Sequence, residues 1–138
     1  MTDPEQVVEA NLKFYFALES QDIDLMDEVW ATDASAICVH PGETRLAGWE
    51  NIRASWEQMF KSTNTFLRID VSEVSVEVQG STAWVSCLES VTTANGDNIR
   101  RAQAYATNVF VFEDDRWLLV LHHASVTPDS SEGAGLIP

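Results

Sequence analysis

The residues best suited to proton transfer in this sequence are its three histidines and one glutamate that lies in an apolar segment. His40 follows an apolar run and comes directly before Pro41–Gly42, while His122 and His123 are adjacent in another apolar run. Histidine changes its charge near neutral pH, so each is a candidate general acid or base. Burial of Glu89 among apolar residues would raise its carboxyl pKa into the range that suits acid–base catalysis. Whether these side chains act together depends on the face of the fold that each one occupies.

Residues 99–125 have the pattern of a hairpin, with two long apolar segments around a polar turn at residues 113–116. Side chains alternate between the two faces of a strand, so the pairing set by this turn decides which residues share a face. We predict that Asn108 and His123 lie on a face that forms a pocket floor, and that His122 points to the opposite face. The predicted pairs are Phe112 with Trp117, Phe110 with Leu119, Asn108 with Leu121 and Ala106 with His123.

Glu89 joins the pocket face when the register is carried one strand further. The turn at residues 95–98 contains Asn-Gly, a strong hairpin signal, and it pairs Glu89 with Ala104. Glu89 then shares its face with Asn108, as expected for an acid–base set. The alternative is a structural role, in which the carboxylate reaches solvent or the arginines at positions 100–101.

His40 ends the first predicted strand, where a cavity mouth would suit a proton carrier. The alternative is a turn histidine that hydrogen-bonds the loop backbone. A metal site of His40, His123 and Glu89 is conceivable, because two histidines and a carboxylate form a known type of open site, but no H-x-H or H-x₃-H spacing supports it. We therefore expect no metal and no other cofactor. The sequence also contains no G-x-S-x-G motif and no glycine-rich phosphate loop.

Aromatic side chains would supply the walls of a pocket for an apolar ligand. Aromatic residues at helical spacing are also typical of plain core packing, and both roles can hold where the roof of a cavity is part of the core. The candidate substrate-binding residues are Tyr15, Trp30, Trp49, Trp56, Phe60, Cys87 and Phe110.

Helix caps and apolar periodicity predict the elements that position these residues. The fold class is α+β, with three N-terminal helices packed on a strongly curved antiparallel sheet. A change of phase in the first long strand predicts a β-bulge near Ser72–Glu73, which would add to the curvature. The predicted helices cover residues 4–20, a shorter segment after Asp22, and 49 to about 61; the predicted strands cover 34–40, the stretch from 66 to the turn at 79–81, 83–94, and the two arms of 99–125.

The last predicted strand is apolar on both of its faces. One face is covered by the helices, so the opposite face of the sheet needs a cover as well. The simplest cover is a second copy of the same sheet, and we predict a homodimer formed through this outer face.

Length and composition limit the remaining classes of function. The 138 residues fit one domain, predicted over residues 1–128, followed by a flexible tail over 129–138. The formal net charge of −14 disfavours partners such as nucleic acids and anionic membranes, because both are bound through Lys and Arg. With no apolar run of 18 residues and no signal-peptide pattern, we expect a cytoplasmic location, where Cys38 and Cys87 stay free thiols.

Three stretches resemble the SnoaL-like branch of the NTF2-like superfamily, which includes ketosteroid isomerase, scytalone dehydratase, limonene epoxide hydrolase and polyketide cyclases. They are WATDASAICVHPG, GWENIRASWEQMF and ATNVFVFEDDRWLLVLHHAS, and the likeness covers about residues 5–127. The distinctive marks are H-P-G after the first strand, G-W before the third helix, T-N-V-F, and the terminal W-x₅-H-x-S. This resemblance implies a cone-shaped α+β barrel, usually dimeric, with a pocket between the helices and the sheet.

The resemblance also implies roles at three positions. The general base of ketosteroid isomerase matches His40, its oxyanion acid matches Asn108, and its partner tyrosine falls near Phe14, with Tyr15 adjacent. All three positions differ from the isomerase pattern, so steroid isomerisation is not expected. His40 as base and Asn108 as amide donor would still form a proton-transfer pair. The Asp/Arg/Asp set of the limonene enzyme is not found on the pocket face.

Two functions therefore remain open. The first is a cofactor-free enzyme that isomerises, dehydrates or cyclises a small apolar carbonyl compound through a histidine base. The second is a non-catalytic module of the same fold that binds a ligand or dimerises.

Overall fold

The computed structural model describes residues 3–33, 35–62 and 65–129. Its elements are α1 (Pro4–Ser20), α2 (Ile23–Val29), β1 (Ile37–Val39), β2 (Leu46–Ala47), α3 (Trp49–Ser62), β3 (Phe66–Gln79), β4 (Thr82–Asn95), β5 (Asn98–Glu113) and β6 (Arg116–Val126). The part of the predicted tail beyond Asp129 lies outside the described residues. No helix in the described ranges is long and apolar enough to cross a membrane.

The two N-terminal helices begin at the aspartates that the sequence indicates. The side chain of Asp3 accepts a hydrogen bond from the backbone N–H of Glu5, with Pro4 at the start of α1. Asp22 caps α2 in the same way. These carboxylates satisfy N–H groups that the first turn of a helix leaves without partners. The predicted bounds of α1 and the cap of α2 are confirmed.

The six strands form one open sheet in the order β2-β1-β6-β5-β4-β3. β1 runs parallel to β6, and every other neighbouring pair is antiparallel. The sheet does not close, so the predicted barrel is corrected to a curved open sheet. β1 is shorter than predicted, and β2 was not predicted because its two residues carry no periodicity.

The register of β3, β4 and β5 follows the prediction. Ala94 pairs with Ile99 across the β4–β5 turn, and Glu89 pairs with Ala104. In β3 the register shifts between Ser72 and Ser75, where Glu73 has a φ of 51°. The predicted bulge is confirmed, and bulges of this kind bend a strand.

The register of β6 differs from the prediction in its second half. Val109 pairs with Leu121 and Phe110 with Leu119, so Val120 has no partner in β5 and forms a second bulge. The extra residue reverses the alternation of the side chains that follow it. The predicted pairs Phe112–Trp117 and Phe110–Leu119 are confirmed; the predicted pairs of Asn108 and Ala106 are wrong, because these residues pair with His122 and Ala124.

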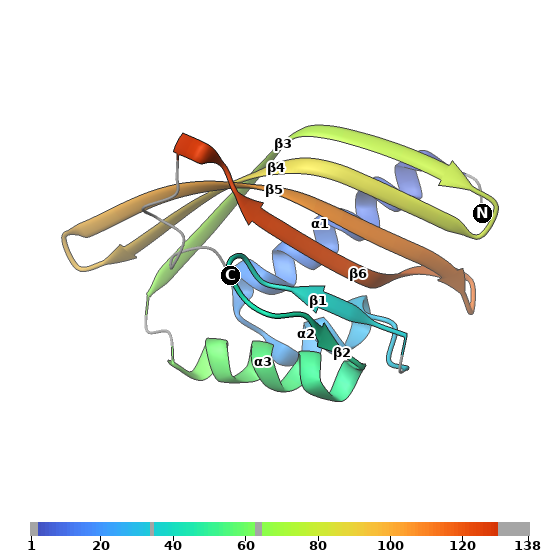
Figure 1. Cartoon of the computed structure of the whole chain (residues 1–138), viewed down its shortest axis with the longest axis horizontal. Coiled ribbons are helices and arrows are strands. Elements are labelled where there is room, and N and C mark those ends of the chain that lie inside the picture. The colour runs from blue at the N-terminus through green and yellow to red at the C-terminus, as the bar shows by residue number, and fades with distance from the viewer. Residues whose placement is uncertain (1–2, 34, 63–64, 130–138) are drawn as a thin grey trace.

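The hydrophobic core lies between the helices and one face of the sheet. α1 lies along the long strands and contacts β3, β4 and β6, while α3 lies against β1 and β2 (Figure 1). Trp30, Trp56 and Phe14 are fully buried between these layers. Large side chains on the opposite face of the sheet, including Trp84 and Tyr105, are exposed.

Candidate functional site

A chain of hydrogen bonds between polar side chains crosses the core. The Tyr15 hydroxyl donates to Glu89 Oε2 over 2.6 Å and accepts from Asn108 Nδ2 over 3.1 Å. Asn108 Nδ2 also donates to Asn11 Oδ1 over 2.8 Å, and Asn108 Oδ1 lies 2.6 Å from His122 Nδ1. All five side chains are buried. We call Glu89, Tyr15, Asn11, Asn108 and His122 the polar chain.

Four elements position the polar chain. Asn11 and Tyr15 are one turn apart on α1, so their side chains extend from the same side of the helix. Glu89 lies on β4 and Asn108 on β5, at inward-facing positions of the predicted register. His122 lies on β6, directly opposite Asn108. The chain therefore links the first helix to three neighbouring strands.

The hydrogen-bond pattern assigns the tautomer of His122. Both hydrogens of the Asn108 amide are used by Asn11 and Tyr15, so its oxygen is left to accept. His122 Nδ1 must then carry the hydrogen of the short contact, and His122 Nε2 keeps its lone pair. His122 Nε2 is buried and has no hydrogen-bond partner among the described residues.

Burial controls the protonation of both ends of the polar chain. Burial raises the pKa of Glu89 to about 7, while the hydrogen bond from Tyr15 acts in the opposite direction. Burial also lowers the pKa of His122 to about 3, assisted by the charges of His40 and His123. At neutral pH His122 is therefore a neutral imidazole, and Glu89 lies close to the midpoint of its titration. The alternative position for Glu89, at the surface or with the arginines at 100–101, is wrong.

His40 lies directly after β1 and is also buried. Its Nε2 lies 3.0 Å from the Ser55 hydroxyl, which donates its only hydrogen to the Ile52 carbonyl over 2.8 Å. Ser55 can only accept from His40, so Nε2 carries the hydrogen and Nδ1 keeps the lone pair. Nδ1 has no partner within the described ranges, and burial lowers the pKa of His40, whereas the charge of Glu43 raises it. The ring bonds a helix side chain, not the loop backbone.

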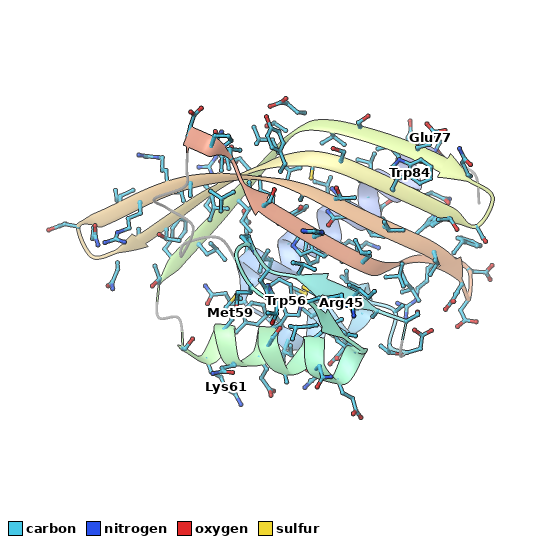
Figure 2. All side chains as sticks on the ribbon, in the orientation of Figure 1. Arg45, Trp56, Met59, Lys61, Glu77 and Trp84 are labelled. Atoms are coloured by element: carbon cyan, nitrogen blue, oxygen red, sulfur yellow. The ribbon has the colours of Figure 1, made fainter. Side chains whose placement is uncertain are left out.

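The two histidine rings meet at Trp56. The ring centroids of His40 and Trp56 are 4.7 Å apart in an edge-to-face arrangement, and those of Trp56 and His122 are 6.2 Å apart. Phe14 packs on both rings, with its ring centroid 4.9 Å from that of His122 and 6.0 Å from that of Trp56. Figure 2 shows Trp56 between α3 and the sheet. β1 and β6 bring the histidines together, because Cys38 pairs with His122 in the parallel ladder.

The predicted substrate-binding residues are mostly core residues. Trp30 stacks on Trp49 at 5.6 Å, and Phe60 stacks on Trp56 at 6.1 Å and is half-buried. Cys87 lies 3.5 Å from the Tyr15 hydroxyl, and its pKa is raised by burial. The residues that belong to the hydrophobic core cluster are Tyr15, Trp30, Trp49, Trp56, Cys87 and Phe110.

His123 is not part of this site. The bulge at Val120 turns His123 to the exposed face of the sheet and places His122 inside, so the predicted faces of these two histidines are wrong. The conceivable metal site of His40, His123 and Glu89 is not assembled for the same reason. No group of three or more metal-ligating side chains occurs in the part of the chain that the structure describes.

A separate groove of about 460 Å³ lies between the two N-terminal helices and the tip of the β5–β6 hairpin. It contains no histidine and none of the polar chain, so its position does not match the predicted pocket. Its walls come from α1, α2 and the tip of the β5–β6 hairpin: Gln6, Glu9, Ala10, Lys13, Phe16, Leu25, Glu28, Val29, Phe112, Asp115, Arg116 and Trp117.

The sequence analysis does not predict Asn11 or Ser55 as part of the site, and it places His122 on the wrong face. Asn11 could have been found, because an amide one turn before Tyr15 shares its helix face. Ser55 could not have been found in this way, because it lies next to Trp56 in the sequence and adjacent positions on a helix do not share a face. His122 could not be distinguished from His123, because the apolar run before it carries no alternation and gives no sign of the bulge.

Comparisons with known proteins agree with this architecture. A candidate dehydratase of the NTF2-like family from Streptomyces avermitilis is 34% identical, with a TM-score of 0.84 and coverage of 91% of this chain and 96% of that chain. A candidate calcium/calmodulin-dependent protein kinase type II association domain from Thiobacillus denitrificans is 31% identical, with a TM-score of 0.70 and coverage of 86% and 92%. Matched structures also include NTF2-like proteins with a cystatin-like fold.

The F-box protein SKIP8 of Arabidopsis thaliana is 24% identical over 120 residues, which are 87% of this chain and 49% of that protein. The chain thus spans about half the length of this curated relative. A family model for the SnoaL-like domain matches residues 7–129. Together with the three helices and the six-stranded sheet, this match shows that the chain belongs to the SnoaL-like family of NTF2-like proteins.

Proposed function

We propose that this protein performs cofactor-free acid–base chemistry on a small, largely apolar molecule, as an isomerase, dehydratase or cyclase. The observation that carries the proposal is a pair of buried imidazole nitrogens, His40 Nδ1 and His122 Nε2, with no hydrogen-bond partner among the described residues. Each keeps a lone pair, and both rings contact Trp56. A buried polar atom without a partner is costly, so a functional reason for it is expected.

The two histidines suit different roles. An effective general base has a pKa near the working pH. Burial takes the pKa of His122 to about 3, too low for a base at neutral pH, and its ring instead offers a hydrogen-bond acceptor. Burial lowers the pKa of His40 as well, but the nearby charge of Glu43 raises it and partly offsets that effect. We therefore assign His40 as the proton acceptor and His122 as the group that orients the substrate.

The rest of the polar chain acts as positioning residues. Asn108 fixes the tautomer of His122, Tyr15 fixes the amide of Asn108, and Glu89 accepts from Tyr15. An amide does not titrate, so the polar chain does not carry a proton from end to end. Its role is to hold the His122 lone pair in one direction, the kind of support that a preorganised site requires.

Similarity to the candidate dehydratase from Streptomyces avermitilis supports a lyase-type reaction. In a dehydration of this kind, a base removes a carbon-bound proton next to a carbonyl group. The carbon–carbon double bond forms as the carbon–oxygen bond breaks, and the leaving hydroxide takes up a proton to become water. His40 supplies the base and, once protonated, the proton for the leaving group.

The test uses 3-hydroxycyclohexanone, a small compound that loses water to form an ultraviolet-absorbing enone. We expect the wild-type protein to accelerate this reaction and His40→Gln to abolish the acceleration. His123→Gln is the matched control, because its ring is on the exposed face of the sheet, and it should retain the wild-type rate. Equal rates with wild type and His40→Gln would contradict the assignment of the base.

A second function, ligand binding without catalysis, is favoured by the deep burial of both histidines and by the low pKa of His122. It predicts no turnover by the wild-type protein, together with a higher melting temperature in the presence of a small apolar ligand. The same experiment therefore separates the two functions.

We further propose that two copies associate through the outer face of the sheet. Trp84 pairs with Val109 there, and Leu88 pairs with Tyr105, so the exposed Trp84 and Tyr105 rings lie on one face of neighbouring strands. Figure 2 shows Trp84 at the end of the sheet away from α3. The same surface on a second copy offers matching apolar area.

A further inference from the structure

The nitrogen atoms of three buried rings form a donor and acceptor set without partners. His40 Nδ1 and His122 Nε2 each keep a lone pair, and the indole N–H of Trp56 is a donor only. None of the three atoms has a hydrogen-bond partner among the residues described. Both imidazole rings contact the Trp56 ring, so the three rings lie in one small region of the core.

We propose that this region binds a hydroxyl oxygen, which accepts a hydrogen bond from Trp56 and donates to a histidine. A hydroxyl group is the simplest group that both accepts and donates at one atom. A carbonyl oxygen would satisfy Trp56 but would leave both histidine nitrogens unpaired. The inference rests on the proposed function, because it names the group of the ligand that this part of the site binds: a hydroxyl group, in addition to any carbonyl group that the ligand carries.

Water and an alcohol both offer an oxygen that can accept a hydrogen bond from Trp56 and donate one to a histidine. Water has two hydrogens and satisfies both His40 and His122 while accepting from Trp56. The hydroxyl group of an alcohol has only one hydrogen, so it can donate to only one of the two histidines. The carbon skeleton of the alcohol then lies toward the other histidine. The aromatic rings of Phe14 and Phe60 next to the set suit such a skeleton.

Other indoles in the core do not share this arrangement. Trp30 and Trp117 also have an unpartnered N–H in the described chain. The rings that pack on them are Phe14 and Trp49 for Trp30 and Phe112 for Trp117, and none of these has an acceptor nitrogen. The combination of one donor with two acceptors is a property of the Trp56 region.

The first part of the test is the tautomeric state of the histidines, read from long-range ¹H–¹⁵N NMR spectra of the ligand-free protein. We expect hydrogen on Nδ1 of His122 and on Nε2 of His40. The three histidine spin systems are assigned with His-to-Gln variants. The opposite tautomer at either ring would remove an acceptor from the set and overturn the proposal.

The second part compares cyclohexanol, cyclohexanone and methoxycyclohexane, which share a six-membered ring but differ in hydrogen-bonding ability. Cyclohexanol should shift the ¹⁵N resonance of one histidine acceptor and the indole N–H of Trp56, with a dissociation constant at least about tenfold lower than that of the ketone or the ether. An equal or tighter affinity for cyclohexanone would overturn the proposal.

Water as the occupant gives a different result, which supports the donor and acceptor set but overturns a hydroxylated compound as its ligand. In that case a cross-relaxation signal connects bound water to the Trp56 indole N–H, and cyclohexanol leaves the resonances unchanged. Neither a water signal nor an alcohol response would overturn the proposal. Trp56→Phe should remove the alcohol response, and Trp49→Phe, which changes an indole stacked on Trp30, should keep it. The turnover of 3-hydroxycyclohexanone is measured separately, so a failure of the proposed reaction is distinguishable from a failure of the hydroxyl site.

Discussion

The Tyr15 hydroxyl lies 2.6 Å from Glu89 Oε2, and this bond joins α1 to β4 in the centre of the core. Both side chains are almost completely buried. The pKa of Tyr15 is raised by burial and by the charge of Glu89, so the phenol keeps its hydrogen and remains the donor. The helix and the sheet are thereby held together by a polar contact inside an otherwise apolar interface.

Replacing Tyr15 by Phe should destabilise the protein by about 1–3 kcal/mol, because Glu89 and Asn108 would each lose a buried partner. The pKa of Glu89 should rise further, since the hydrogen bond from Tyr15 lowers it. Denaturant unfolding at pH 7 measures the first effect. Tyr105→Phe is the control, because the Tyr105 side chain is exposed; an equal loss in both variants would show that the buried bond contributes nothing.

The polar chain should also make stability depend on pH in two opposing ways. Glu89 has a pKa of about 7 in the folded protein, above the ordinary value of 4.5 for a glutamate side chain. Its contribution is fully present below pH 4.5 and is lost as the pH rises to 7. His122 has a pKa of about 3 in the folded protein, below the ordinary value of 6.5 for a histidine side chain. Its contribution is present above pH 6.5 and is lost as the pH falls to 3.

Between pH 4.5 and 6.5 these two contributions change by about 1.4 kcal/mol per pH unit in opposite directions and cancel. Glu89→Gln should remove one of them. The free energy of unfolding of this variant, relative to wild type, should therefore increase by about 3 kcal/mol from pH 4.5 to pH 7. Chemical denaturation across this range measures the difference. Glu77→Gln, on an exposed position of β3, should follow wild type at every pH; a constant difference for Glu89→Gln would refute the buried titration.

The strand register that positions the residues of this site was predictable between β4 and β5, but not between β5 and β6. The Asn-Gly turn at 95–98 sets the register between β4 and β5, because a tight turn leaves little freedom in register. Glu89 therefore pairs with Ala104, and Asn108 with Val85, as predicted. In β6, residues 118–121 are all apolar, so the sequence has no alternation to reveal the unpaired Val120. One bulge there exchanged the faces of His122 and His123.

Hydrogen-bond partners within the core were harder to predict than faces. Tyr15 was expected as an aromatic wall, yet its hydroxyl is the centre of the polar chain. Asn11 is a polar residue on a helix, and such residues are usually exposed, so the sequence does not indicate its role in the core. The edge of the sheet formed by β1 and β2 was also hard to predict. These strands are only three and two residues long, and periodicity cannot define such short strands.

Asn108→Asp should raise the pKa of His122 from its value of about 3 in the wild-type protein. A carboxylate 2.6 Å from His122 Nδ1 would stabilise the imidazolium form. The change also removes the donors to Tyr15 and Asn11, so a lower free energy of unfolding is expected. NMR titration of the His122 ring measures the pKa. Asn98→Asp, exposed at the start of β5, is the control; an unchanged His122 pKa in Asn108→Asp would show that the two side chains do not interact.

Trp84→Asp should weaken the proposed association of two copies. The substitution would place a carboxylate on the outer face of the sheet in a protein that already carries a net charge of −14, so two such faces would repel each other. Sedimentation velocity should show a dimer for the wild-type protein and a shift toward monomer for this variant. Leu12→Asp introduces the same charge on the exposed side of α1 and should leave the dimer intact. If Leu12→Asp gave monomer and Trp84→Asp did not, the interface would lie on α1, because only a residue within the interface brings the added charges close enough to oppose association.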